Sequence, residues 1–519
     1  MKSEDLFDAI GNIDGNMIVN AQTPPKQKVF YKKTAWISAI AAMFVLSVTL
    51  LGLGFLGSEN KILQVPIITD LETVGSVTTE SPATVPTTST GSTPTTNPPV
   101  TTYRNYWIHA LAAAIYPEEV PYPEGDHFSE EYREQYSKWS KYGTDKNQLY
   151  RELDVNIKEF LSASIGEFLS QKNGENLVFS PLNVYMAFAM LAETTDNNSR
   201  QQILDVLGCD SIETLREEAS AIWQATYSDD GRITSILSSS VWLSNQNSYK
   251  QETLQQLADI YYASSFSGEM GSEEYNKALE SWLNEQTGGL LKPNVEMDSE
   301  TIMALATTLY FKAGWVDPFS SKNNREGTFH AANGDISCTF MNQNVRADCY
   351  LGEKFIAVPK ELGLNYKSTM WLILPNEGVT PEELLTDEEA MAFLTNPKNV
   401  TSKKDFNVNL SLPKFDVSSD LDLIEGMKNL GITDVFNGSI SDFSPITDDR
   451  SDIFVRAADH SARVTIDEEG CTAAAFTFIG IGPESVPLQI DVTFDRPFLF
   501  TITSDVGLPL FVGIVNQPN

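Results

Sequence analysis

Apolar side chains recur with helical spacing in two stretches of the chain. The first stretch runs from Ile157 to Leu169 and the second from Leu254 to Tyr261, and in each the apolar residues fall on one face of a helix. The residues that define these faces are Ile157, Phe160, Leu161, Ile165, Phe168 and Leu169, then Leu254, Leu257, Ile260 and Tyr261. This pattern predicts two amphipathic helices, each covering another layer of the protein.

Runs rich in β-branched and aromatic residues predict the strands of that second layer. They occupy residues 302–311, 370–374, 406–412, 488–494 and 498–502. Helical and strand-like stretches alternate from residue 151 onward without a repeat or a further linker. We therefore expect residues 151–519 to form a single α+β domain built on a substantial sheet.

The first hundred residues have a different character. No charged residue interrupts the apolar run 34–58, which is long enough to cross a bilayer as one helix. Lysines crowd its N-terminal flank (Lys26, Lys28, Lys32 and Lys33), so the positive-inside rule predicts that residues 1–33 are cytoplasmic and that everything after residue 58 is outside. A cleaved signal peptide is the alternative, but the run is too long for one and lacks a clear small-x-small cleavage site.

Two further segments precede the predicted domain. Residues 59–102 are dominated by a Thr-, Ser- and Pro-rich stretch with almost no large apolar side chain, which predicts an extended tether. Residues 103–150 mix aromatics with Glu, Lys and Pro, which predicts a short helical extension packed on the main domain. The composition of this extension indicates no specific role.

Charge and cysteine content narrow the range of functions. The formal net charge of -34 disfavours nucleic acid and anionic lipid headgroups as partners. Basic protein partners fit this charge, although acidity that serves only solubility explains it equally well. The four cysteines (Cys209, Cys338, Cys349 and Cys471) include no CxxC pair, which argues against a zinc site or a disulfide scaffold. Cys338 and Cys349 flank a predicted hairpin and could form a bridge, and unpaired thiols are an equal alternative.

Signatures of catalysis are missing from the sequence. There are four histidines (His109, His127, His330 and His460), and no GxSxG, HExxH or Walker-type motif occurs. Acidic pairs such as Glu468 and Glu469 are expected by chance in so acidic a chain, and His460 is best explained as a satisfied core histidine. We therefore expect no catalytic residue, no metal site and no cofactor, and the chain is predicted not to be an enzyme.

The segment from Asp467 to Pro487 is ambivalent between strand and loop. As a strand it would alternate, with Cys471, Ala473, Ala475, Thr477, Ile479 and Ile481 on one face and Thr472, Ala474, Phe476, Phe478 and Gly480 on the other. Gly480, Gly482 and Pro483 oppose a stable strand further along, so the same residues also suit an exposed loop. This two-state character points to a conformational mechanism.

Motifs on both sides of this segment resemble those of the serpin family, in the family's order. They are NLVFSPLNVYMAFAML (176–191), TTLYFKAGWVDPF (307–319), LPKFDVSSDLDLIEGMKNLGITDVF (412–436), DRPFLFTI (495–502) and PLFVGIVNQP (509–518). The resemblance spans nearly all of residues 151–519. It implies the serpin fold, with a large central β-sheet, covering helices and an exposed reactive-centre loop.

The resemblance also implies a mechanism. The loop acts as bait for a serine protease, and after cleavage and formation of the acyl-enzyme its N-terminal part inserts as a new strand, so that the distorted protease cannot deacylate. The family's spacing from Gly470 places the scissile bond at Glu484-Ser485, with Ile481 or Val486 as alternatives. A glutamate there favours a glutamate-specific protease, and the apolar alternatives favour elastase-like or subtilisin-like ones.

Further positions are carried over from the family as structural roles. The hinge of the loop corresponds to Glu468, Glu469, Gly470, Cys471, Thr472, Ala473, Ala474 and Ala475. The shutter under the sheet corresponds to Asn176, Ser180, Pro181 and His460, and Trp315 with Glu468 marks the region where insertion begins. The chain departs from the family at Thr307 and Glu280, where asparagines are usual, at Cys471, where Thr or Ser is usual, and at the bulky Phe476.

The expected protein is a monomeric, membrane-anchored inhibitory serpin with its inhibitor domain outside the cell, and a bacterial surface suits the anchor and tether. Its expected partners are extracellular serine proteases held in a covalent acyl complex, and the membrane through residues 34–58, but no nucleic acid. Phe476, Cys471 and the altered shutter leave a non-inhibitory serpin acting as a surface binding protein as the alternative. A membrane-bound hydrolase or sensor is a third class, which the missing catalytic signatures disfavour.

Overall fold

A computed structural model describes residues 109–153, 155, 157–170, 174–292, 294–363, 368–449, 452–471 and 488–518. The chain divides into two units, residues 1–98 and 99–519, and all described residues belong to the second. The predicted membrane span 34–58, the linker 59–102 and the loop residues 472–487 lie outside the described residues. No helix among the residues that are described is both long and apolar enough to cross a membrane.

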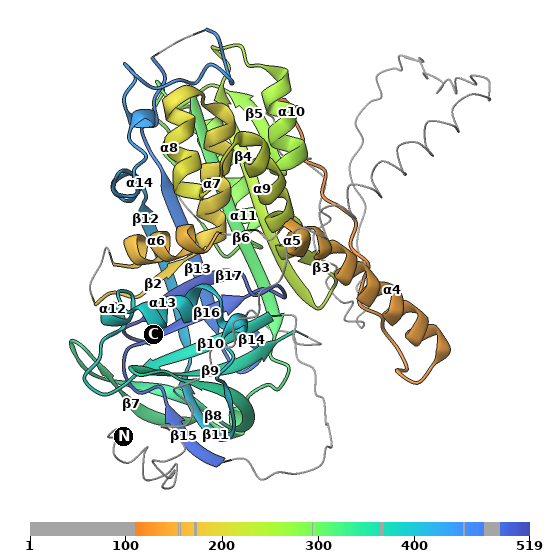
Figure 1. The fold of residues 1–519 in the computed structure, drawn as a ribbon, viewed down its shortest axis with the longest axis vertical. Helices are drawn as coiled ribbons and strands as arrows, with labels where there is room; N and C mark the ends of the chain where they lie inside the picture. Colours follow the sequence, from red (N-terminus) through yellow and green to blue (C-terminus); the bar gives the residue numbers. More distant parts are fainter. Residues whose placement is uncertain are drawn as a thin grey trace, which may run out of the picture. The chain divides into compact units, whose positions relative to one another are not determined.

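An eight-stranded sheet runs the length of the described unit (Figure 1). Its strands follow the order β1 (His109–Ala112), β5 (Ala263–Gly268), β4 (Ile233–Ser244), β6 (Met303–Gly314), β14 (Gly470–Cys471), β13 (Asp459–Ile466) and β12 (Phe415–Asp422), and β3 (Ser228–Asp229) pairs with β4. The central strand β6 pairs with β4 along nearly its whole length. On its other side, the partners of β6 among the residues that the structure describes are the two residues of β14.

The second sheet has nine strands within the described residues. They follow the order β15 (Leu488–Thr493), β11 (Lys404–Pro413), β8 (Gly334–Leu351), β9 (Phe355–Leu362), β10 (Ser368–Pro375), β16 (Phe498–Thr503), β17 (Pro509–Val515) and β2 (Leu177–Phe179), and β7 (Arg325–Ala331) pairs with β8. Strands β10, β16 and β17 are buried along their whole length, which explains their nearly continuous apolar sequence. The chain thus passes from β14 in one sheet to β15 in the other through residues 472–487.

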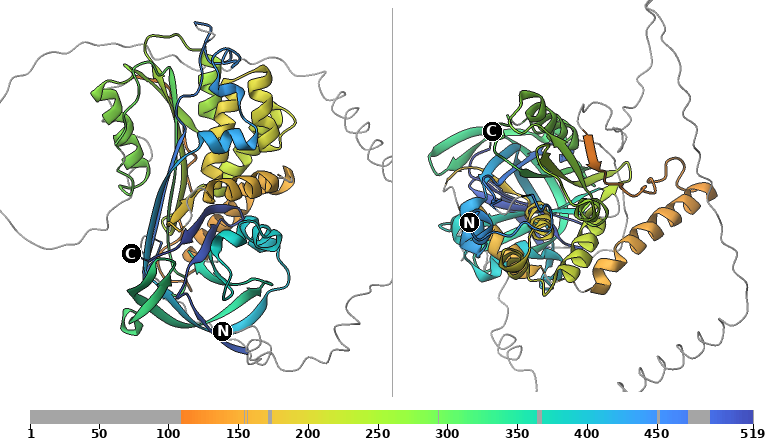
Figure 2. Two further views of the ribbon diagram at one scale, coloured as in Figure 1. Left: turned by 90° about the vertical axis from the view of Figure 1, so that its left-hand side faces the viewer. Right: turned by 90° about the horizontal axis from the view of Figure 1, so that it is seen from above.

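Helices cover both faces of the eight-stranded sheet (Figure 2). Helix α11 (Glu273–Gln286) packs Tyr275 and Trp282 against Trp242 of β4 and Phe266 of β5 in a small separate core. The opposite face packs into the main core under α7 (Pro181–Thr194), α8 (Asn197–Leu207) and α9 (Ile212–Thr226). The other helices are α4 (Glu130–Lys146), α5 (Gln148–Leu153), α6 (Lys158–Leu169), α10 (Gln251–Ile260), α12 (Pro381–Leu384), α13 (Glu388–Thr395) and α14 (Ile424–Leu430), with 3-10 turns at Ser321–Asn323, Pro397–Asn399 and Asp434–Phe436.

The two amphipathic helices and all five predicted strands are confirmed as α6, α10, β6, β10, β11, β15 and β16. The prediction of a hairpin between Cys338 and Cys349 was wrong, because both cysteines belong to the single long strand β8. Residues eleven apart in one strand lie roughly 35 Å from each other, whereas a disulfide needs Cα atoms within about 7 Å. All four cysteines are free and buried.

The extension that precedes the domain is helical in part, as predicted, but it begins with a strand. β1 pairs antiparallel with β5 and so forms one edge of the eight-stranded sheet. Trp139 of α4 is 4% exposed and its indole N–H donates to Oδ2 of Asp230 at 2.9 Å. The same Asp230 accepts through Oδ1 from the backbone N–H of Ile233, where β4 begins. The extension is therefore bonded to the turn that leads into β4.

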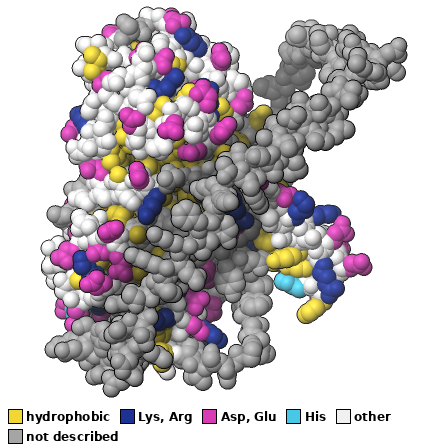
Figure 3. All heavy atoms as spheres, viewed as in Figure 1, with side chains coloured by type: hydrophobic (Ala, Val, Ile, Leu, Met, Phe, Trp, Pro, Cys, Tyr) yellow, Lys and Arg dark blue, Asp and Glu magenta, His cyan; other side chains and the backbone are white. Residues whose placement is uncertain are grey.

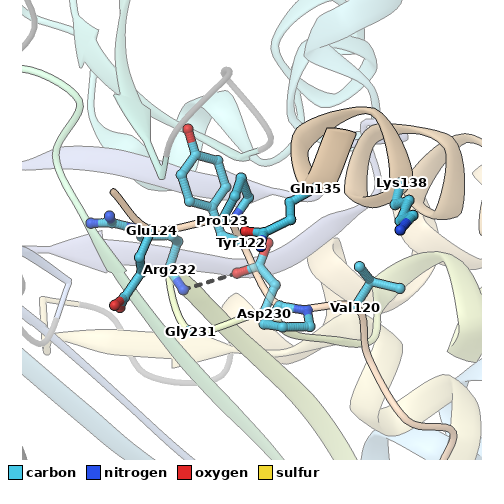
Figure 4. A pocket seen from close by; sticks show the side chains of 10 residues that line it. Val120, Tyr122, Pro123, Glu124, Gln135, Lys138, Asp230, Gly231 and Arg232 are labelled. Atoms are coloured by element: carbon cyan, nitrogen blue, oxygen red, sulfur yellow. Dashed lines mark hydrogen bonds between the residues drawn. The ribbon is translucent and has the colours of Figure 1, made fainter. Parts of the chain in front are cut away.

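A pocket of about 530 Å³ lies beside this contact (Figure 4). Its walls come from residues 120–124, from Gln135 and Lys138 of α4, and from the turn at Asp230 and Arg232. Over the face of the protein seen in Figure 3, acidic and basic side chains are interspersed. The lining of the pocket repeats that mixture of charges.

Candidate functional site

The start of the loop is a tight turn at the end of β13. The carboxylate of Asp467 accepts hydrogen bonds from the backbone N–H groups of Glu469 at 2.8 Å and Gly470 at 3.2 Å. Gly470 has φ +147°, a conformation that L side chains rarely adopt, and a Cβ there would lie 2.7 Å from the Cα of Gly314. Only glycine therefore fits this turn, which agrees with its predicted place in the hinge.

After this turn the chain enters the sheet. Gly470 pairs with Gly314 of β6, and Cys471 pairs both with Ala313 of β6 and with Ile466 of β13. No other ladder pair links β6 to β13 within the described residues: β6 otherwise pairs with β4, and β13 with β12. Within the described residues, the facing edges of β6 and β13 therefore hold between them the two residues of β14. A longer strand could continue along the same edges.

Trp315 and Phe319, in the segment after β6, hold the residues just before Gly470. The backbone N–H of Trp315 donates to the carbonyl of Glu469 at 2.9 Å, and its indole N–H donates to the carbonyl of Asp467 at 2.9 Å. The backbone N–H of Phe319 donates to the carbonyl of Glu468 at 3.0 Å. Trp315 and Glu468 thus lie close together in the structure. The resemblance to the family had assigned both residues to the region where insertion begins.

The carboxylate of Glu468 has two partners of its own. It lies 2.7 Å from the ammonium of Lys414 and accepts from the side-chain amide of Asn324 at 2.6 Å. Partial burial works to raise the pKa of Glu468, but these two hydrogen bonds outweigh it and lower the pKa below its ordinary value. Glu468 is therefore ionised at neutral pH and anchors the hinge. Sequence analysis missed Lys414 and Asn324 as its partners.

A second polar group lies under the middle of the sheet. Ser180, the residue before α7, donates its backbone N–H to Nε2 of His460 at 3.1 Å. His460 on β13 is 3% exposed, and burial lowers its pKa to about 4. Its imidazole is therefore neutral at pH 7, with the proton on Nδ1 because Nε2 accepts. Ser180, Pro181 at the first position of α7, and His460 come together as predicted.

Asn183 belongs to the same group and was not predicted. Its side-chain amide reaches from the first turn of α7 and donates to the carbonyl of Thr307 on β6 at 3.3 Å. Position 307 lacks the asparagine that the family comparison led us to expect, and α7 supplies an amide to that position instead. The hydroxyl of Ser180 and Oδ1 of Asn183 have no hydrogen-bond partner among the described residues. The spacing Ser180-x-x-Asn183, one helical turn, is the signal that could have found it.

Asn176 lies apart from this group. Its Oδ1 accepts from the backbone N–H groups of Asn516 and Gln517, and its Nδ2 donates to the carbonyl of Gln517 at 2.7 Å. The side chain therefore fixes the chain end that follows β17. Glu280 on α11 accepts from the backbone N–H of Val295 at 2.9 Å.

Cys471 occupies the hinge position where the family usually has Thr or Ser. It is 3% exposed, and burial raises the pKa of its thiol to about 12. The thiol is therefore protonated and unreactive while β14 is in place. The remaining predicted positions, Thr472, Ala473, Ala474 and Ala475 of the hinge and Glu484 and Ser485 of the reactive bond, lie outside the described residues. Within the described ranges, no three His, Cys, Asp or Glu side chains are placed to hold a metal.

Comparisons with known proteins place this arrangement in a family. The sequence model described as "Serpin (serine protease inhibitor)" matches residues 156–518. Alpha-1-antiproteinase of Rattus norvegicus is 28% identical over 387 residues, which cover 72% of this chain and 91% of the relative. A protein of Cyanea capillata named serine protease inhibitor is 28% identical over 362 residues, covering 66% and 93%.

Solved structures show the same fold. The native state of the thermophilic serpin tengpin superposes with a TM-score of 0.64 at 24% identity, covering 79% of this chain and 99% of tengpin. Human thyroxine-binding globulin with its hormone superposes with a TM-score of 0.62 at 20% identity, covering 72% and 99%. The chain belongs to the serpin family. This is a family of protease inhibitors and not of enzymes, which confirms that the chain is not an enzyme.

Proposed function

We propose that this protein is an inhibitory serpin that traps serine proteases as a suicide substrate. The observation that supports this most directly is the two-residue strand β14, which starts the loop between β6 and β13 in a register that a longer strand can continue. The names of the relatives in Rattus norvegicus and Cyanea capillata agree with an inhibitory role. The proposal includes anchorage through residues 34–58, with a cytoplasmic tail 1–33, and display of a monomeric serpin domain outside a bacterial cell.

The register of β14 assigns each loop residue a destination after cleavage. If that register continued antiparallel to β6 and β13, Ala473 would lie between Phe311 and Val464. Ala475 would likewise lie between Leu309 and Ala462. Phe311, Val464 and Ala462 are buried and belong to the main core. The small alanines therefore meet the core side of the sheet, as the alternation in the sequence predicts.

The same register carries the strand over the polar group under the sheet. Thr477 would lie between Thr307 and His460. Its hydroxyl would point to the side from which α7 presents the unpartnered Ser180 hydroxyl and Asn183 carbonyl oxygen. Insertion would then offer a hydrogen-bond partner to polar atoms that have none among the described residues.

The driving force of insertion is large on this account. A dozen strand residues, at about 1 kcal/mol net for each backbone hydrogen bond, contribute on the order of 10 kcal/mol before apolar burial. That is comparable to the whole stability of an ordinary domain. The energy suffices to displace an acylated protease, provided that insertion is faster than hydrolysis of the acyl-enzyme.

The targets we propose are extracellular elastase-like or subtilisin-like serine proteases, with cleavage after Glu484, Ile481 or Val486. The test incubates the full chain in detergent with an elastase-like, a subtilisin-like and a glutamate-specific protease. We expect an SDS-stable complex with at least one of them, and none with the same protease lacking its active-site serine. The N-terminal sequence of the released peptide then identifies the scissile bond.

Clean cleavage of the loop by all three proteases without any complex would contradict the proposal. It would favour a non-inhibitory serpin that acts as a surface binding protein.

A further inference from the structure

A buried lysine lies directly behind the segment that holds the hinge. Lys360 of β9 is 2% exposed. Its ammonium lies 4.7 Å from the ring centroid of Phe319 and 5.5 Å from that of Trp315. It donates one hydrogen bond to Oε1 of Gln343 at 2.6 Å and another to the carbonyl of Asp317. One side chain thus contacts three residues of the 315–319 segment.

The 315–319 segment lies between β9 on one side and the hinge on the other. Toward β9, the backbone N–H of Val316 donates to the carbonyl of Glu361 at 3.0 Å. Toward the hinge, the three hydrogen bonds from Trp315 and Phe319 hold Asp467, Glu468 and Glu469. Lys360 ties the Asp317 and Phe319 end of this segment to the nine-stranded sheet, together with Gln343 of β8, whose Nε2 donates to the carbonyls of Asp317 and Pro318 at 3.4 Å.

A lysine at this position is costly. Burial lowers the pKa of Lys360 to about 8, against the opposing influence of the carboxylates of Asp317 and Glu361. An apolar side chain of similar length would fill the same space without burying a charge. What the lysine adds is its hydrogen bonds to Asp317 and Gln343 and its contacts with the two rings. The hydrogen bond to Asp317 and the contacts with Trp315 and Phe319 act on the segment that holds the hinge, and the hydrogen bond to Gln343 fixes the ammonium against β8.

We propose that Lys360 is a positioning residue of the hinge: it holds the 315–319 segment in the geometry that keeps Asp467, Glu468 and Glu469 docked and Cys471 paired between β6 and β13. The effect on protease trapping rests on the function proposed above, but the docking of the hinge does not. Without Lys360, the carbonyl of Asp317 keeps only the longer hydrogen bond from Nε2 of Gln343 at 3.4 Å, Oε1 of Gln343 loses the ammonium, and Phe319 loses its cation–π contact. The hinge should then leave the sheet more often.

The four buried free cysteines provide a local measurement of this opening. The full chain is treated with a thiol reagent at pH 7.4, and the labelling rate of each cysteine is followed by peptide mass spectrometry. In Lys360→Met we expect Cys471 to be labelled about tenfold faster. Cys209 and Cys349, which are 4% and 0% exposed in other parts of the core, should change less than twofold.

The matched control is Lys354→Met. Lys354 directly precedes β9, its side chain is 47% exposed, and it pairs with Asp387, away from the hinge. This variant should leave the labelling of Cys471 unchanged. If Lys360→Met does not fold, Gln343→Ala is the second variant. It removes one acceptor of the ammonium and the two hydrogen bonds of 3.4 Å that Gln343 donates to the carbonyls of Asp317 and Pro318, and it should raise the labelling rate of Cys471 about threefold.

An equal acceleration at all cysteines would mean that Lys360 serves only general stability, and no acceleration at Cys471 would mean that the hinge is held without it. Either result would overturn the proposal. The experiment uses no protease, so a chain that forms no covalent complex but shows the selective rise at Cys471 would refute the proposed function and leave the role of Lys360 standing.

Discussion

The insertion register gives Ala475 a precise destination, and a charge placed there should convert inhibitor into substrate. In the inserted strand, residue 475 lies between Leu309 and Ala462 on the core side of the sheet. No cation faces that side at these two neighbours. Ala475→Glu would therefore bury an unpaired carboxylate.

The size of the effect follows from the burial. A carboxylate left unpaired in a core costs about 3–5 kcal/mol. If about 1.4 kcal/mol of this cost raises the activation free energy of insertion, insertion slows about tenfold. If the unaltered chain forms the covalent complex in roughly nine of ten cleavage events, the variant would form it in only about half of them. The full penalty would abolish trapping.

The assay is the stoichiometry of inhibition, measured as the ratio of covalent complex to cleaved chain on denaturing gels. Ala474→Glu is the matched control, because residue 474 would lie on the opposite face between Tyr310 and the exposed Arg463. The control should trap protease nearly as well as the unaltered chain. If Ala475→Glu and Ala474→Glu had the same stoichiometry of inhibition, whether high or low, the proposed register of the inserted strand would be refuted.

The remaining predictions concern the described residues. Burial keeps the folded-state pKa of His460 at about 4, whereas an unfolded histidine titrates near about 6.5, so the unfolded chain takes up the proton first as the pH falls. The free energy of unfolding should therefore fall by about 3 kcal/mol as the pH is lowered from 6.5 to 4. Denaturant titrations at pH 6.5 and at pH 4 measure this fall, which should be smaller in His460→Gln. Trp139→Phe removes the indole hydrogen bond to Asp230, which is worth about 2 kcal/mol, and should lower the unfolding midpoint by about 2 °C; an unchanged midpoint would mean that this hydrogen bond adds no stability. Gly470→Ala forces a Cβ against Ala313 and should lower the midpoint while raising the labelling rate of Cys471, and a variant that changes neither would contradict the strained turn.

Periodicity was enough to predict the regular elements. Helices such as α6 and buried strands such as β16 carry an apolar pattern that their own sequence displays. Strand β1 was missed because four residues at a sheet edge show too short a pattern to distinguish from a coil. The hairpin proposed between Cys338 and Cys349 failed because β8 continues for 18 residues, well beyond the usual strand length.

The site shows a similar division. Gly470, Ser180 and His460 were predicted because the resemblance to the family carries them, and the structure adds the conformational reason why position 470 is a glycine. The pairing of Lys414 with Glu468 could not be predicted, because it joins the residue between β11 and β12 to the turn between β13 and β14 and depends on side-chain positions in the folded chain. The contact of Lys360 with the 315–319 segment was missed for the same reason, since a lysine in a strand is ordinarily exposed to solvent.

The most direct test of the account is the thermal stability of the chain before and after a single cut in the loop. The full chain is nicked within residues 472–487 by limited proteolysis, and the unfolding midpoint of the described unit is compared with that of the intact chain. Insertion worth on the order of 10 kcal/mol should raise the midpoint of a unit of this size by about 12 °C. A midpoint that stays the same or falls would contradict insertion of the loop between β6 and β13, and with it the inhibitory mechanism.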